Sequence, residues 1–118
     1  MSHLFFLKLK SNVTSNNDSL LQNIAAIDEA VQSRGLNKIT LEQLKNGFIL
    51  PPTASFIVYG YSTPIETRNT LEGIILEGFN VNVISDAINE ISYKLEREFI
   101  GHQNWMGALT TEQLLEFV

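Results

Sequence analysis

The chain has 118 residues, of which 44% are hydrophobic and 18% are charged, and its formal net charge is −5. The length suits one domain, which we place at residues 1–118, and the composition excludes a disordered chain. The sequence has no cysteine, which excludes disulfides, thiolate metal sites and a thiol nucleophile. The acidic balance and the lack of any run of Lys or Arg argue against nucleic acid as a partner.

Neither a membrane span nor a secretion signal is predicted. No apolar stretch approaches the roughly 20 residues of a membrane helix, and Lys8 interrupts the apolar start of the chain. We therefore expect a cytoplasmic protein with no membrane partner. His3 and His102 lack the spaced partners of a metal site, and no glycine-rich phosphate loop is present, so no metal or other cofactor is expected.

The N-terminal part predicts a strand and a helix. Residues 4–9 are dense in apolar side chains, as in a strand buried on both faces. A polar segment at residues 11–18 precedes a helix whose apolar side chains repeat at spacings of four, three and four, and Gly35 is placed to end it. That apolar face comprises Leu20, Ile24, Ile27 and Val31.

A short strand at residues 37–40 is predicted next. Thr40 and Gln43 form a capping box for a brief helix at residues 41–46. Pro51 and Pro52 then exclude a helix and begin a turn.

The middle of the chain carries the clearest strand–helix signal. Residues 54–61 predict a buried strand, and three agreeing signals begin a helix directly after it. Thr63 is the N-cap, Pro64 takes the first helical position, and Glu66 completes a capping box. We expect this helix to run to about Glu77 and to end at Gly78.

The C-terminal part predicts two more strands and two helices. Residues 79–83 alternate as a strand, and Ser85 or Asp86 is expected to cap a third helix. The apolar face of that helix would hold Ile88, Ile91, Leu95 and Phe99, and a Glu90–Lys94 pair would support it. A short strand near Ala108 and a last helix capped by Thr110 and Gln113 complete the chain.

Alternating strands and helices favour an α/β fold, a three-layer α/β/α domain with a mostly parallel, Rossmann-like sheet of four or five strands. With strands numbered along the chain, the expected order is 2-1-3-4-5. A ferredoxin-like sandwich stays open as an alternative, in which residues 48–50 pair as a hairpin across the two prolines.

The second half of the chain resembles the isochorismatase-like cysteine hydrolases. The resemblance rests on SFIVYGYSTPIETRNT, on LEGIILEGFNVNVISDAI and on the closing GALTTEQLLEFV. The matching positions are Gly60, Thr63, Thr70, Gly78, Asp86 and Ala87. HLFFLKLK and the two segments that follow it match more loosely, and a middle segment of the family's usual domain is missing.

The resemblance implies that the family's chemistry is lost. The family uses an Asp after the first strand, a Lys from the middle segment and a Cys at the start of the helix. Lys8 stands at the Asp position, Glu66 stands at the Cys position, and the Lys segment is deleted. The resemblance also implies a cis peptide between Tyr61 and Ser62.

Six residues form a hypothetical remnant pocket, and no catalytic residue is expected among them: Lys8, Lys10, Tyr61, Ser62, Thr63 and Glu66. Glu66 is interpreted as a helix cap in preference to a base, because the helix dipole favours its anion. Lys8 either pairs with Glu66 across the pocket or, like Lys10, reaches solvent from the strand end. Trp105 is interpreted as a lid over the core or as an interface anchor.

The sequence thus predicts a non-catalytic pseudoenzyme with the isochorismatase-like fold, acting through protein contacts as a homodimer or larger oligomer. The alternative is a small-molecule binder, or a degenerate hydrolase, that uses the remnant pocket. An inhibitor that blocks a protein partner is a third reading. An open cavity at the remnant pocket would favour the small-molecule binder.

Overall fold

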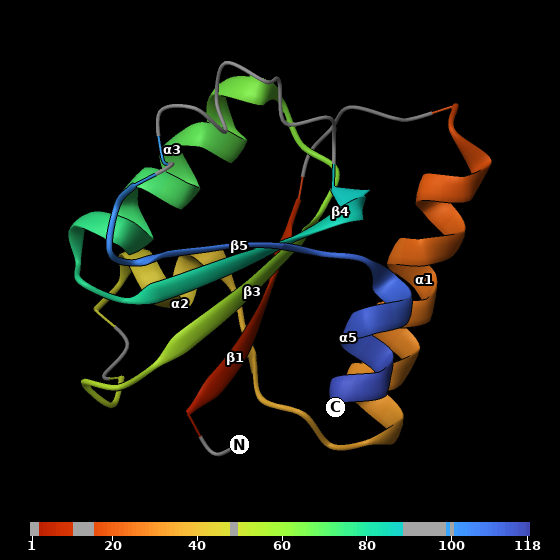
Figure 1. Ribbon diagram of the computed structural model, residues 1–118, viewed down its shortest axis with the longest axis horizontal. Coiled ribbons are helices and arrows are strands. Elements are labelled where there is room, and N and C mark those ends of the chain that lie inside the picture. Colours follow the sequence, from red (N-terminus) through yellow and green to blue (C-terminus); the bar gives the residue numbers. More distant parts are fainter. Residues whose placement is uncertain (1–2, 11–15, 48–49, 89–98, 100) are drawn as a thin grey trace.

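The computed structural model describes residues 3–10, 16–47, 50–88, 99 and 101–118 (Figure 1). Its sheet has five strands in the order β2-β1-β3-β4-β5, and every pair of neighbours is parallel. The strands are β1 (Leu4–Leu9), β2 (Lys38–Ile39), β3 (Ser55–Gly60), β4 (Asn80–Ile88) and β5 (Trp105–Leu109), and the helices are α1 (Asp18–Ser33), α2 (Leu41–Lys45), α3 (Pro64–Leu76) and α5 (Thr111–Phe117). The predicted strand order is confirmed.

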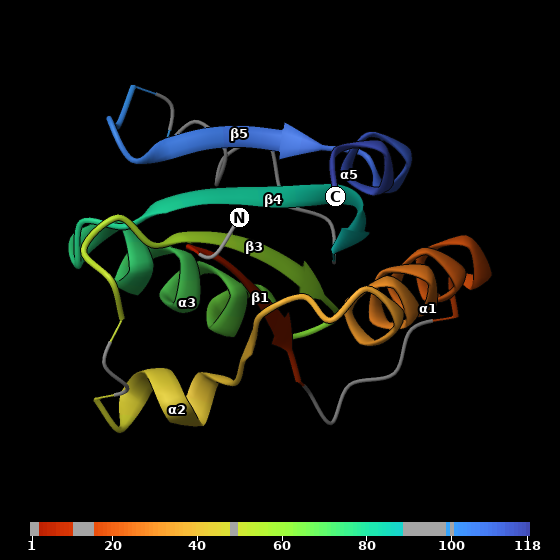
Figure 2. The same cartoon turned by 90° about the horizontal axis from the view of Figure 1, so that it is seen from below.

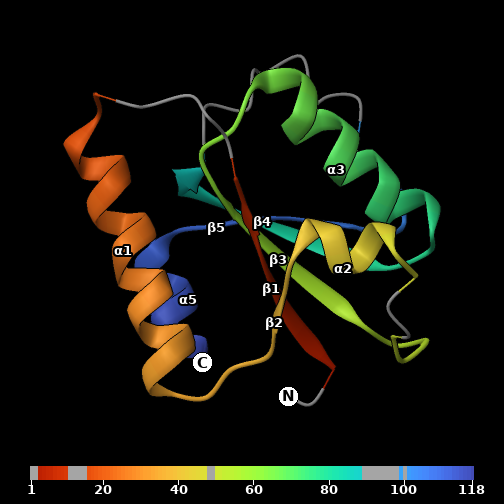
Figure 3. The same ribbon diagram turned by 180° about the vertical axis from the view of Figure 1, so that it is seen from behind.

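Helices cover both faces of the sheet. Figures 2 and 3 show α1 and α5 on one side and α2 and α3 on the other. The side chains of each strand alternate between these layers, so Phe6 packs towards α1 while Leu7 and Leu9 pack towards α3. Each face therefore has its own apolar core, and the three-layer prediction is confirmed.

The ferredoxin-like alternative is wrong. It required an antiparallel hairpin around residues 48–50, whereas each strand pair among the described residues is parallel. Residues 48 and 49 lie outside the described part of the chain. The polar turn at Pro51 and Pro52 leads directly into β3, which lies beside β1 in the middle of the sheet.

Three predicted helix starts are confirmed by their caps. Thr40 with Gln43 and Thr110 with Gln113 each form both bonds of a capping box. Thr63 caps α3 through a hydrogen bond from the backbone N–H of Glu66 to its Oγ1. Local side-chain chemistry was therefore sufficient to place these three helices.

The predicted cap at Ser85 or Asp86 is wrong, because β4 continues through both residues to Ile88. Pairing with neighbouring strands decides this: Ile84 lies opposite Leu109, and Ile88 lies opposite Gly60. Most of the predicted third helix, including the Glu90–Lys94 pair, falls on residues 89–98, outside the described part. None of the helices that the structure describes is long and apolar enough to cross a membrane.

Candidate functional site

The carboxyl ends of β1 and β3 lie side by side and bring the predicted site residues together. Leu9 is paired with Gly60, so the residues that follow each strand meet at one edge of the sheet. Between them lies a hollow of about 570 Å³, which we call the edge hollow. Its polar lining is Lys8, Lys10, Tyr61 and Glu66, and its apolar lining is Leu9, Leu21 and Ile24.

Ser62 and Thr63, also predicted for this pocket, do not line the edge hollow. Ser62 is buried, and its hydroxyl donates a 2.6 Å hydrogen bond to Glu66 Oε2. Thr63 is the N-cap of α3. Both side chains therefore hold the start of the helix that positions Glu66.

Glu66 forms only one of the two hydrogen bonds of the predicted capping box. Its backbone N–H donates to Thr63 Oγ1 as expected, but its carboxylate accepts from Ser62 in place of the backbone of Thr63. A buried hydroxyl needs a hydrogen-bond partner, and Ser62, one residue before the cap, is within reach of the carboxylate. Glu66 thus remains tied to the helix start while it lines the edge hollow.

Lys8 does not pair with Glu66; that interpretation is wrong. Its ammonium lies 2.6 Å from Asp28 Oδ2, and both side chains are partly exposed. Lys8 lies two residues after Phe6, on the face of β1 that α1 covers, which directs it towards Asp28. Lys8 is therefore paired with α1, and no Lys8–Glu66 ion pair fills the edge hollow.

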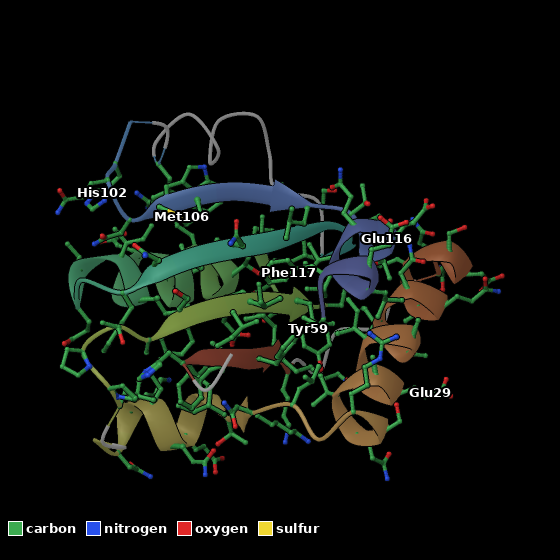
Figure 4. All side chains as sticks on the ribbon, turned by 60° about the horizontal axis from the view of Figure 1, so that its bottom comes forward. Glu29, Tyr59, His102, Met106, Glu116 and Phe117 are labelled. Atoms are coloured by element: carbon green, nitrogen blue, oxygen red, sulfur yellow. The ribbon has the colours of Figure 1, made fainter. Side chains whose placement is uncertain are left out.

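Asp28 also accepts a hydrogen bond from a buried phenol. Tyr59, on β3 near α1 (Figure 4), donates from its hydroxyl to Asp28 Oδ1 at 2.7 Å. Burial, followed by the hydrogen bond and the charge of Asp28, raises the pKa of Tyr59 above its ordinary value. Asp28 thus joins the ammonium of Lys8 and the phenol of Tyr59, and the three side chains connect β1, β3 and α1.

The sequence prediction missed Asp28 and Tyr59. One signal was present: Asp28 lies four residues after Ile24 and three before Val31, so it falls on the apolar face of α1. Glu29, the next residue, is exposed and points away from the sheet (Figure 4). A carboxylate on the buried face of a helix requires a partner, and the adjacent strand supplies Lys8.

Gly60 allows the two strand ends to approach closely at the site. Its φ of +110° is a conformation that side chains disfavour. A Cβ there would lie 2.8 Å from the carbonyl oxygen of Leu9 and 2.9 Å from its nitrogen. The geometry of the edge hollow therefore depends on glycine at this position.

Two further hollows adjoin the same sheet edge. The lysine hollow, of about 490 Å³ between α1 and β2, is lined by Lys8, Lys10 and Lys38 together with Asp28. The helix hollow, of about 650 Å³ between α2 and α3, has a mixed polar and apolar lining that includes Lys10 and Glu66. Lys10 is common to all three hollows.

Trp105, the predicted lid or anchor, begins β5. Its ring stacks on Phe99 with centroids 5.5 Å apart, and it packs against the core on the α3 face. It does not line the edge hollow. It lies on the edge strand β5, at the opposite edge of the sheet from β2.

Two other expectations concern the peptide backbone and metals. The peptide bond between Tyr61 and Ser62 is trans, so the cis bond implied by the resemblance is wrong. Within the described part of the chain, no group of three His, Asp or Glu side chains is arranged to hold a metal ion.

Comparison with protein-family models, curated proteins and solved structures gives no match. The site must therefore be interpreted from its own geometry.

Proposed function

We propose that the chain is a non-catalytic small-molecule-binding domain with an isochorismatase-like fold and that its ligand binds in the edge hollow. The observation that carries this proposal is the convergence of four predicted residues on one hollow of about 570 Å³. That volume falls within the range of roughly 300–1,000 Å³ for small-molecule sites. The four residues are Lys8, Lys10, Tyr61 and Glu66.

The lining suits a molecule that carries both charges. Lys10 can receive a carboxylate and Glu66 an ammonium group, while Leu21 and Ile24 offer apolar contacts. Free amino acids have this chemistry and are the natural first probes.

The same contacts support a non-catalytic role. Glu66 accepts from Ser62 at the N-terminus of α3, and Lys8 is paired with Asp28. A general base or nucleophile needs a free, suitably basic group close to the substrate. Lys8 and Glu66, which stand at two catalytic positions of the hydrolases that the sequence resembles, are both held in structural contacts here.

Titration of the full chain with a panel of free amino acids, followed by amide NMR shifts, tests the proposal. We expect saturable shifts around Leu9, Tyr61 and Glu66 for at least one member. Glu66→Gln keeps an acceptor for Ser62 but removes the charge, and we expect about tenfold weaker binding. Glu77→Gln, at the other end of α3, is the matched control.

Two results would count against the small-molecule proposal. One is equal affinity in wild type and Glu66→Gln. The other is the absence of saturable shifts for every panel member up to about 10 mM, a concentration that detects even very weak binding.

A second candidate function is self-association through β5. This strand forms an edge of the sheet, and Met106 on it and Phe117 on α5 are 50% and 62% exposed (Figure 4). An edge strand offers unpaired backbone groups, and two copies can pair about a two-fold axis. Sedimentation equilibrium should then show a dimer that Met106→Glu dissociates; a wild-type monomer at about 0.1 mM protein, well above the Kd of stable dimers, would reject this candidate.

A further inference from the structure

The lysine hollow concentrates positive charge in an acidic protein. Lys8, Lys10 and Lys38 line it, and Asp28 is its one acidic side chain. The chain as a whole has 13 acidic against 8 basic residues. Three of the eight basic residues thus face one hollow, and its local charge is opposite in sign to that of the protein.

The sheet register explains this concentration. Lys38 is paired with Phe6 across β2 and β1, and Lys8 and Lys10 follow Phe6 at alternate positions. Side chains at alternate positions, and at paired positions of neighbouring strands, lie on the same face of a sheet. Lys8 and Lys38 are therefore directed to the α1 face, and Lys10, which directly follows β1, lines hollows on both faces.

Lys8 and the other two lysines have different roles. Lys8 is neutralised by Asp28, which the buried Tyr59 also holds in place. The ammonium groups of Lys10 and Lys38 make no hydrogen bond or ion pair with any other residue that the structure describes. Two uncompensated cations therefore border the hollow.

The remaining lining is part polar, from Gln32, Thr40 and Tyr59, and part apolar. Val31 is buried and Leu36 is partly buried, and both lie on the α1 face of the sheet. Ile39 also borders the hollow, although its side chain packs in the core on the α3 face. A bare inorganic anion would leave this surface uncovered, whereas an organic anion would cover it.

We propose that the lysine hollow binds a small organic carboxylate. Its carboxylate lies between Lys10 and Lys38, and its apolar body rests on Val31 and Leu36. The site shares Lys8 and Lys10 with the edge hollow but differs from it by Lys38, which lines neither the edge hollow nor the helix hollow. The inference thus goes beyond the small-molecule function proposed above.

Amide NMR titrations of the full chain with benzoate, with uncharged benzamide and with inorganic phosphate test this site. We expect benzoate to give saturable shifts at Asp28, Lys38 and Ile39, with a dissociation constant of roughly 1 mM for so small a ligand. Benzamide should bind at least about tenfold more weakly because it lacks the charge. Raising the salt from about 0.02 to 0.2 M should weaken benzoate binding.

Lys38→Met is the diagnostic variant, and Lys45→Met, on α2, is its control of equal charge change. Lys38 is exposed, so the variant should fold, which its amide spectrum verifies. Benzoate affinity should fall about tenfold in Lys38→Met and stay unchanged in Lys45→Met.

Four results would overturn the proposal. They are no saturable benzoate shift up to about 50 mM, equal binding of benzamide, phosphate binding at least as tight as benzoate, and benzoate binding that survives Lys38→Met. A fifth result, shifts confined to Leu21 and Tyr61 with none at Lys38 or Ile39, would place benzoate in the edge hollow. That outcome rejects the lysine-hollow site while it supports the small-molecule function.

Discussion

At the scale of single residues, Asp28 links two strands of the sheet to α1. Its two oxygens accept from Lys8 and from Tyr59, which come from neighbouring strands. The phenol of Tyr59 is buried, so its ionised form is strongly disfavoured in the folded protein. This arrangement predicts a specific pH dependence.

Tyr59 should make the protein less stable in alkali. Its folded pKa is raised, so in the unfolded chain the phenol loses its proton near pH 10 while in the folded protein it keeps it. The contribution of Tyr59 to the free energy of unfolding is constant below that pH. Above it, the free energy of unfolding falls by about 1.4 kcal/mol per pH unit. Tyr59→Phe should remove this slope, as measured by urea unfolding between about pH 8 and 11.

Tyr59→Phe should also lower the free energy of unfolding by about 1 kcal/mol at neutral pH, because Asp28 loses a hydrogen bond. Its stability deficit relative to wild type should therefore shrink as the pH rises. A deficit that stays constant to pH 11, one unit above the ordinary pKa of about 10, would contradict this account of Tyr59.

Gly60→Ala should be among the most damaging small substitutions. The added methyl would overlap the backbone of Leu9, and the positive φ adds conformational strain of order 1–3 kcal/mol. We expect a loss of at least about 3 kcal/mol in the free energy of unfolding. Gly78→Ala is the control, because its φ is +86° but no atom lies within 4 Å of the new Cβ; an equal loss in both variants would show that contact with Leu9 is unimportant.

At the scale of elements, Asp86 ties the end of β4 to the start of α5. Its Oδ1 accepts from the backbone N–H and from the hydroxyl of Thr111, at 2.8 and 2.7 Å. A helix of seven residues has little stability by itself. Its position therefore depends on this contact and on buried Leu114.

Asp86→Ala should loosen α5 selectively. The loss of two hydrogen bonds to a carboxylate at a helix N-terminus predicts about 1–2 kcal/mol of destabilisation. Hydrogen exchange of the α5 amides should accelerate more than that of the β1 and β3 amides. Ser85→Ala, which removes one 3.3 Å hydrogen bond to Leu109, is the neighbouring control; uniform acceleration through the sheet would contradict a local role for Asp86.

At the scale of the whole molecule, both cores share one sheet, and we expect a single cooperative unfolding transition. The one tryptophan, Trp105, reports on β5, where it packs against the α3-face core. Its fluorescence and the far-UV circular dichroism should give coincident denaturation curves. A fluorescence transition at lower denaturant would show that β5 unfolds independently.

The fold was largely predictable because short, local sequence patterns indicate its strands and helix caps. The run of apolar residues in β3 and the Thr63–Pro64 start of α3 needed no knowledge of the rest of the chain. The end of β4 could not be predicted this way, because Ser85 and Asp86 resemble a helix cap and become strand only through pairing with β3 and β5.

The site was predicted in part for the same reason. The residues after β1 and β3 had to meet once the parallel order was known. The partner of Lys8 depends on the placement of α1 over the sheet, so the Lys8–Asp28 pair emerged only from the three-dimensional structure. The Ser62–Glu66 bond is local, but it depends on the burial of Ser62, which the sequence pattern did not indicate.

The Lys8–Asp28 pair also restricts which residues position 8 can accept. An aspartate there would set two carboxylates against each other beside a buried phenol. An acidic residue at position 8 is therefore penalised for as long as Asp28 is present. A chain that acquires one would first need a change on α1, 20 residues away in the sequence.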